Sequence, residues 1–304
     1  ACTGDGENGD ADLDTSFAAQ MASTWHYTGA PQPVQIGIVV ADSQGRRFVT
    51  QGSVDVSFAF LGANGSGDPQ PGPSATAEYV PVPGTDASGS DPTVTASAGV
   101  YEAEDVTFDR AGVWRATVDV TVDGVARELA AEFAVANESA IPAPGMEAPR
   151  TETLTVDSKD VREGAIDSTA DGGGDIPDPE LHEVTIAEAI ELGRPALVLF
   201  GTPAYCTSRF CGPEVTALQR LAAEHPDRAE YIHVEIWKDY RAEPQVVNQG
   251  AADWLLRGTE ESPQMTEPWL YLIGPDGIIV ERWGPLFDTS EVAAALEALP
   301  AADA

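Results

Sequence analysis

Positive charge is scarce in this sequence. Lysine and arginine together number 16, of which only Lys159 and Lys238 are lysines, against 50 aspartates and glutamates, so that the net charge is −34. A surface this acidic repels phosphate groups, which argues against nucleic acid and anionic lipid surfaces as partners. The composition predicts a solvated acidic surface of the kind expected in a salty environment.

Long hydrophobic runs are also lacking. No apolar stretch approaches 18 residues, so no membrane-spanning helix is predicted. Hydrophobic residues nevertheless make up 42% of the chain, which excludes a disordered protein and is enough for packed cores. A length of 304 residues is typical of two domains.

Cysteine is rare, and its three positions are Cys2, Cys206 and Cys211. The start Ala1-Cys2, followed by a Gly/Asp-rich stretch, resembles a bacterial lipoprotein just after its signal peptide. The resemblance implies that Cys2 carries the lipid anchor, that residues 1–14 form a disordered tether, and that the protein is extracytoplasmic, anchored at the cell surface and in contact with the membrane only through its lipid. An arbitrary chain start or an unpaired thiol is the alternative. Export would place Cys206 and Cys211 in an oxidising compartment.

Residues 15–136 have the pattern of an all-β domain. Val54, Val56, Phe58 and Phe60 alternate with smaller or polar residues, which predicts a half-buried strand. Short strands of this kind, separated by Gly/Pro-rich turns and without a convincing helix, favour an antiparallel sandwich. The segment "FDRAGVWRATVDV" resembles the late strands of bacterial immunoglobulin-like domains, which implies that Trp114 packs in the core.

Residues 137–180 are rich in Pro and Gly and are interpreted as a linker, and residues 181–304 alternate between helix and strand. Thr185 and Glu188 form a capping-box pattern at the start of a short helix that ends before Gly193. An apolar strand, "RPALVLF", comes next, then an amphipathic helix, a second strand, a hairpin around Pro-Asp-Gly, and a closing helix capped by Thr289 or Ser290.

Residues 181–300 resemble the exported TlpA-type thioredoxin-like proteins of bacteria. The pieces that carry the resemblance are "PALVLFGTPAYC", "TEPWLYLIGPDGIIVERWG" and the closing helix. The predicted fold class is therefore an immunoglobulin-like β-sandwich joined to an α/β thioredoxin-like fold. The resemblance implies that Cys206 and Cys211 are catalytic, that Pro268 is cis and lies against them, and that Glu267 and Tyr205 help to bind substrate. It implies no cofactor.

The cysteine spacing departs from that family, which has Cys-x-x-Cys where this chain has four residues between Cys206 and Cys211. On one ideal helix the two side chains would point roughly 140° apart and could not bond. A disulfide therefore requires Cys206 in the loop before the helix and Cys211 near the helix start, where the dipole stabilises a thiolate. Which cysteine is the nucleophile stays open, and Leu199 stands where the family often has a buried acid.

The leading hypothesis is a thiol–disulfide oxidoreductase that acts on the thiols and disulfides of exported proteins. One alternative is a non-catalytic scaffold with a structural disulfide. A peroxidase is another, because "TPAYCTSRFC" resembles one class of peroxiredoxins, although Thr202 lies one residue too early. A Sco-type copper protein is the last, with His233 the best placed of the histidines at 26, 182, 225 and 233. Tyr205 and the tryptophans at 237, 254 and 269 line a peptide surface or simply pack.

Overall fold

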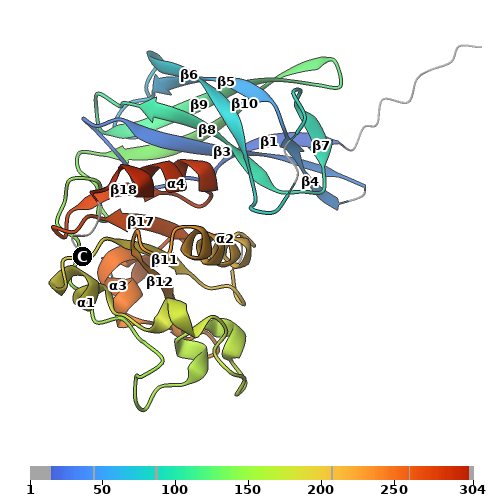
Figure 1. Cartoon of the computed structure of the whole chain (residues 1–304). Helices are drawn as coiled ribbons and strands as arrows, with labels where there is room; N and C mark the ends of the chain where they lie inside the picture. Colours follow the sequence, from blue (N-terminus) through green and yellow to red (C-terminus); the bar gives the residue numbers. More distant parts are fainter. Residues whose placement is uncertain (1–14, 44, 86–87, 207, 260, 301–304) are drawn as a thin grey trace, which may run out of the picture.

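The computed structural model describes residues 15–300 except 44, 86–87, 207 and 260 (Figure 1). Cys2 and the predicted tether, residues 1–14, lie outside the described residues. Within the described part, the first half of the chain forms a ten-stranded sheet. Its strands are β1 (Ser16–Met21), β2 (His26–Tyr27), β3 (Gln32–Asp42), β4 (Gly45–Thr50), β5 (Ser53–Phe60), β6 (Gln70–Pro81), β7 (Thr93–Thr95), β8 (Gly99–Val106), β9 (Gly112–Val122) and β10 (Val125–Ala136).

The second half contains a four-stranded sheet with order β12-β11-β17-β18 and two small hairpins, β13-β14 and β15-β16. Its elements in chain order are the 3₁₀ helices η1 (Glu163–Ala165), η2 (Ser168–Ala170) and η3 (Pro179–His182), then α1 (Ile186–Glu191), β11 (Ala196–Gly201), α2 (Cys211–Glu224), β12 (Glu230–Glu235), β13 (Trp237–Asp239), β14 (Val246–Val247), α3 (Gln249–Leu255), β15 (Arg257–Thr259), β16 (Ser262–Gln264), β17 (Trp269–Ile273), β18 (Ile279–Trp283) and α4 (Thr289–Ala298).

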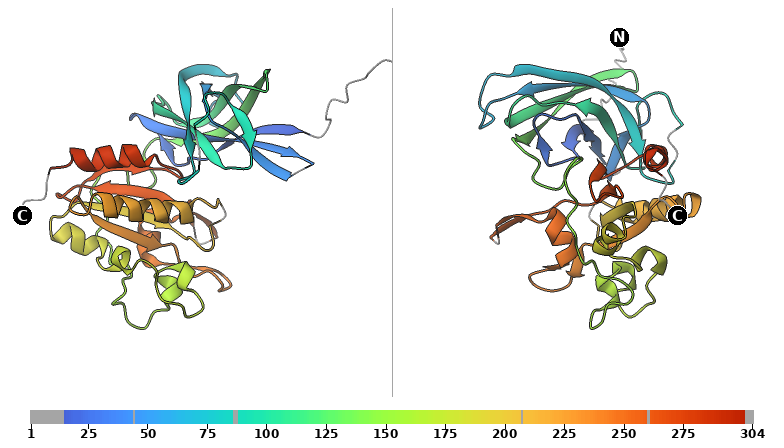
Figure 2. Two further views of the ribbon diagram at one scale, coloured as in Figure 1. Left: turned by 45° about the vertical axis from the view of Figure 1, so that its right-hand side comes forward. Right: turned by 60° about the vertical axis from the view of Figure 1, so that its left-hand side comes forward.

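The predicted fold class is wrong. The structure is mostly β, with 41% strand, 17% helix and four α-helices among the described residues. The first half is not two facing sheets, because strands β1 to β10 pair edge to edge in one curled sheet (Figure 2). Period-two alternation locates half-buried strands but does not state which strands pair. Strand β5 pairs with both β6 and β9, and this joins strands that a sandwich would divide between two sheets.

The curled sheet wraps around its own core. The Arg127 guanidinium on β10 lies 4.0 Å from the ring centroid of Phe17 on β1, which pairs with β3, so strands far apart along the sheet order meet. Trp114 is 1% exposed, and its ring packs against Phe108 with the ring centroids 5.0 Å apart. The prediction that Trp114 is a core residue is therefore confirmed.

The four-stranded sheet is covered on both faces. Along β11, Ala196, Val198 and Phe200 pack with α1 and α3, whereas Leu197 and Leu199 pack with α2 and α4. Both faces of β11 are apolar, as its unbroken hydrophobic run predicts. The parallel pairing of β11 with β12 places the carboxyl ends of both strands at one edge, and the cysteine segment follows β11 there.

Of the two predicted helix caps, the one at α1 is confirmed and the one at α4 is not. Thr185 accepts a hydrogen bond from the Glu188 N–H, and the Glu188 carboxylate accepts one from the Thr185 N–H, which confirms the capping box of α1. At α4 the cap is Asp288, whose carboxylate accepts a hydrogen bond from the Ser290 N–H, so the prediction of Thr289 or Ser290 is wrong. An aspartate immediately before the predicted cap competes for the same role.

Residues 137–180, predicted as a linker, hold the three 3₁₀ helices and several buried side chains. Ile141, Ala148 and Ile166 are each at most 6% exposed. Glu147 forms an isolated antiparallel bridge with Ile278, beside the four-stranded sheet. Figures 1 and 2 show the segment that carries the 3₁₀ helices on the side of this sheet that faces away from the curled sheet.

The two sheets contact each other through side chains and backbone. The Gln35 amide on β3 donates a hydrogen bond to the Leu286 carbonyl oxygen at 2.6 Å, and its oxygen accepts one from the Leu286 N–H at 3.3 Å. Leu286 itself is fully buried in a small cluster with residues 80, 82 and 100 of the curled sheet and its edge. Among the described residues, no helix is long and apolar enough to cross a membrane.

Candidate functional site

Cys206 and Cys211 form a disulfide, with their Cα atoms 6.1 Å apart. Cys211 is the first residue of α2, and Cys206 lies in the loop between β11 and α2. The sequence-based expectation that a bond requires Cys206 outside the helix and Cys211 at its start is confirmed. The two cysteines are the site's central pair.

The two cysteines differ in exposure. Cys211 is fully buried, whereas Cys206 is partly exposed. The Cys211 N–H, at the start of α2, donates a hydrogen bond to Cys206 Sγ at 3.4 Å. The Ser208 hydroxyl lies 3.1 Å from the same sulfur, which in a disulfide can only accept. Cys206 is therefore the more exposed member of the pair, and two donors lie where they could stabilise negative charge on its sulfur.

Glu267 and Pro268 adjoin the pair. A carboxylate oxygen of Glu267 and the two sulfur atoms all lie within 4.8 Å of one another. Burial raises the pKa of Glu267 to about 8, and the charge of Glu235 adds to the rise. Pro268 is buried, and the peptide bond that joins it to Glu267 is cis, as the resemblance drawn from the sequence implied. The structure thus brings Glu267 into the site as a carboxyl that is neutral at neutral pH.

A second buried acid was missed by the sequence analysis. Glu214, in the first turn of α2, is fully buried, and neither carboxylate oxygen has a hydrogen-bond partner. Burial raises its pKa well above the ordinary value. The amphipathic pattern of this helix could have indicated that Glu214 is buried, because Glu214 precedes Val215 on the face that carries the buried residues.

An aromatic cleft of about 610 Å³ opens beside the disulfide. Tyr205 stacks on Tyr240 with ring centroids 4.1 Å apart, and its hydroxyl donates a hydrogen bond to Asp171 at 2.6 Å. Trp237 and Glu267 line the same cleft, together with Pro244, Gln245, Val247, Leu256, Pro263, Met265 and Thr266. The side chains that line the cleft are of mixed apolar and polar character.

Two tryptophans proposed for the peptide surface lie in the core instead. Trp254 is fully buried and donates a hydrogen bond to Thr151 Oγ1 at 3.2 Å. Trp269 is 4% exposed and donates one to Thr266 Oγ1 at 3.0 Å. For these two residues the packing alternative is confirmed.

The curled sheet approaches the cysteine loop from another side. Phe210, next to Cys211, packs on the small cluster that holds Leu286. Ser208, Arg209 and Phe210 line a groove of about 680 Å³ whose other wall is formed by strands of the curled sheet. Arg209 has a backbone φ of 66°, a left-handed conformation that L residues rarely adopt. The loop between the cysteines is therefore held between both halves of the chain.

The four histidines lie in three separate environments. His26 on β2 is buried beside Ser23 and Gln32, within 3.2 and 3.3 Å, and His225 caps the end of α2. His182 and His233 meet each other, with ring centroids 5.0 Å apart. In the described residues, the group around the sulfur atoms consists of Cys206, Cys211 and Glu267 without a histidine.

Comparisons with known proteins identify no family for this chain. No protein-family model matches the chain, and no curated protein matches it significantly. A solved structure, a family 123 glycoside hydrolase from Clostridium perfringens studied for glycolipid glycan hydrolysis, covers 43% of this chain at 12% identity with a TM-score of 0.23. The match covers 29% of the length of that structure. A likeness this low supports no inference about fold or activity.

These findings correct the resemblance drawn from the sequence. The assignment to TlpA-type thioredoxin-like proteins with an immunoglobulin-like domain is wrong, because no comparison returned a protein of either kind and the structure is mostly β. No comparison supports membership of an oxidoreductase family either. The strand, helix and cysteine patterns that carried the resemblance are individually weak, and their order alone does not define a family. The disulfide remains as an observation about this chain itself.

Proposed function

We propose that the Cys206–Cys211 disulfide exchanges with thiols of other proteins. The observation that carries the proposal is the asymmetry of the pair: Cys206 is partly exposed and has a helix N–H and a hydroxyl beside its sulfur, whereas Cys211 is fully buried. A purely structural disulfide needs neither access nor donors at one sulfur. It would also stabilise the fold only modestly, because the loop it closes is short.

The exchange begins when a substrate thiolate attacks Cys206 Sγ. A bond forms between the substrate sulfur and Cys206, the Cys206–Cys211 bond breaks, and its electron pair leaves on Cys211. A second substrate thiolate then attacks the substrate sulfur of the mixed disulfide and releases Cys206. The substrate loses two electrons and gains a disulfide, while the cysteine pair becomes two thiols. The reverse sequence reduces a substrate disulfide.

Glu267 supplies the proton that the leaving Cys211 sulfur needs. Its carboxyl lies within 4.8 Å of both sulfur atoms. Since burial raises its pKa to about 8, it holds a proton at neutral pH and stands close to a thiol in acidity. A donor and an acceptor of similar pKa exchange a proton with little driving force lost.

The substrate is an extended protein segment that lies in the aromatic cleft. Tyr205, Trp237 and Tyr240 offer flat apolar surfaces, and Glu267 connects the cleft to the sulfur atoms. The partners would be exported proteins, because disulfides persist in oxidising compartments. A lipid on Cys2 would hold the protein at the outer side of a membrane, where its tether would let the site reach its substrates.

The test is the reduction potential of the pair, measured by thiol alkylation and mass analysis across a redox-buffer series. A midpoint between roughly −120 and −270 mV is expected, in the range of exchange proteins. A midpoint below about −300 mV would identify a structural disulfide and a scaffold function.

Single variants provide the matched control. Cys211→Ser leaves Cys206 accessible and should trap mixed disulfides with a small thiol or a disulfide-bonded peptide. Cys206→Ser leaves only the buried sulfur and should trap none. Equal trapping by both variants would contradict the assignment of Cys206 as the attacked sulfur.

A further inference from the structure

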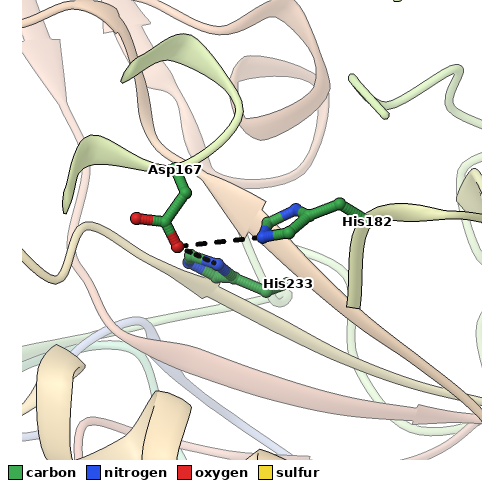
Figure 3. A group of neighbouring side chains, drawn as sticks. All are labelled: Asp167, His182 and His233. Atoms are coloured by element: carbon green, nitrogen blue, oxygen red, sulfur yellow. Dashed lines mark ion pairs between the residues drawn. The ribbon is translucent and has the colours of Figure 1, made fainter. Parts of the chain in front are cut away.

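Three buried side chains from separate segments converge near the cysteine loop. Asp167 precedes η2, His182 ends η3 and His233 lies on β12, and they are 2%, 1% and 1% exposed. One ligand atom from each lies within 4.8 Å of the other two. Figure 3 shows both imidazole rings turned toward the same carboxylate oxygen of Asp167. The cluster is separate from the disulfide and plays no part in the proposed exchange.

The cluster holds polar atoms without hydrogen bonds. Both ring nitrogens of His182 and Nδ1 of His233 are buried and unpartnered. His233 Nδ1 lies 3.4 Å and His182 Nε2 3.8 Å from Asp167 Oδ2, distances that fit an ion pair but lack hydrogen-bond geometry. Two of these atoms, His182 Nε2 and His233 Nδ1, face the same Asp167 oxygen, and because buried polar groups are nearly always satisfied, they indicate a missing partner.

The tautomer of His233 defines what that partner must be. Its Nε2 lies 3.1 Å from the Gly201 carbonyl oxygen, which can only accept, so Nε2 carries a proton. In neutral imidazole Nδ1 then has a lone pair, and this lone pair faces the Asp167 carboxylate oxygen. Two acceptors that face each other need either a second proton on the ring, which makes an ion pair with Asp167, or a metal ion between them.

A zinc ion fits the positions and the chemistry of these atoms. Zinc binds imidazole nitrogen and carboxylate oxygen at about 2.0–2.2 Å, so two tetrahedral ligands lie roughly 3.4 Å apart. The observed separations of 3.4 and 3.8 Å match this spacing with a small inward shift. Two imidazoles and one carboxylate, without a thiolate, are a donor set that zinc commonly takes, with water in the fourth position.

The surrounding groups are those that orient metal ligands. Ligating histidines usually donate their second N–H to a backbone carbonyl, as His233 does to Gly201. The other oxygen of Asp167 accepts hydrogen bonds from the Thr169 N–H at 2.8 Å and the Thr169 hydroxyl at 2.5 Å. These bonds leave Oδ2 free to face the two rings.

We propose that Asp167, His182 and His233 bind a Zn²⁺ ion. The ion would fasten the segment with the 3₁₀ helices to β12, the edge strand of the four-stranded sheet. This segment contacts the cysteine loop, since Ser168 Oγ accepts a hydrogen bond from the Ala204 N–H at 3.1 Å and Asp171 accepts one from Tyr205. The metal would therefore have a structural role that supports the neighbouring site.

The experiment uses the full chain with its disulfide intact, stripped of metal by a chelator and then titrated with Zn²⁺ alone. One equivalent per chain is expected by elemental analysis after dialysis. With Co²⁺ as a spectroscopic probe, visible bands of tetrahedral intensity are expected without thiolate-to-cobalt charge transfer, because no sulfur is among the ligands. This readout needs no variant and so does not depend on whether a substitution folds.

Variants then assign the ligands. His182→Gln and Asp167→Asn should each weaken Zn²⁺ binding by at least about 100-fold. His225→Gln, which removes a histidine at the end of α2, should leave it unchanged. No binding to the wild-type chain would show that His233 instead carries two protons and forms an ion pair with Asp167, and the proposal would be wrong. Thiolate charge transfer, or unchanged binding in both ligand variants, would overturn it equally.

Discussion

At the scale of single residues, the site depends on acids that burial keeps neutral. Glu267 and Glu214 have no cationic partner among the described residues, and burial raises the pKa of each carboxyl. Such groups cost stability in their charged form, and proteins keep them where a proton is needed. A Glu267 carboxylate oxygen lies within 4.8 Å of both sulfur atoms, so we expect its titration to affect both folding and exchange.

Replacement of Glu267 tests this consequence. In the folded chain its pKa is raised to about 8. Between the ordinary value and 8, the unfolded chain releases a proton that the folded chain retains, so the stability contributed by the neutral group is full at low pH and falls as pH rises. Glu267→Gln removes this loss. At pH 8 to 9 the variant should be more stable than the wild type by on the order of 1–3 kcal/mol, and at pH 4 the two should be equal.

Urea unfolding of the oxidised proteins across that pH range measures the difference. The matched control is Glu261→Gln, an exposed position in the same region of the chain, which should run parallel to the wild type. A constant difference between Glu267→Gln and the wild type at every pH would mean that Glu267 does not titrate there. The same variant should slow exchange of the disulfide with a small thiol by roughly 100-fold or more, because the proton donor is gone.

At the scale of elements, the sequence predicts features formed by residues close together in the chain, but not the pairing of distant strands. The capping box at Thr185 is a contact between residues three apart, so the sequence alone could place it. The placement that a bond between Cys206 and Cys211 requires was predictable for the same reason, since helix geometry limits where the two can lie. Pairing of β5 with both β6 and β9 depends on segments far apart, and alternation carries no information about it.

The cluster of Asp167, His182 and His233 is the strongest case of what the sequence could not reveal. Its members are 15 and 51 positions apart and carry no short metal-binding spacing. Only the packing of the 3₁₀ helices against β12 brings them together. The stretch that contains Asp167 was interpreted as a linker because it is rich in Pro and Gly, and composition does not report burial.

The capping box offers a test at this scale. Helix α1 has six residues and buries Ile186, Ala189 and Ile190 against the sheet, so its start matters to the core. Thr185→Ala removes the acceptor for the Glu188 N–H and should lower the free energy of unfolding by about 1 kcal/mol. Thr216→Ala, on the exposed side of α2, should cause no loss because alanine is the better helix former. Equal urea midpoints for the two variants would show that the cap contributes nothing.

At the scale of the whole molecule, the two sheets share a buried contact. Leu286 follows β18 but is fully buried among Val80, Val82 and Val100, and its backbone is hydrogen-bonded on both sides by Gln35. Phe210 from the cysteine loop packs on the same cluster. A contact of this kind couples the unfolding of the curled sheet to that of the sheet carrying the disulfide.

Truncation of Leu286 tests the coupling. Leu286→Ala should cost about 2–5 kcal/mol, because it removes a fully buried side chain and leaves a cavity between the sheets. Since the loss falls on the shared contact, we expect the single calorimetric transition of the wild type to separate into two in the variant. Leu192→Ala, at a leucine that is 65% exposed, should leave the transition unchanged. A wild-type chain that already melts in two transitions would show that the halves unfold independently and that Leu286 does not couple them.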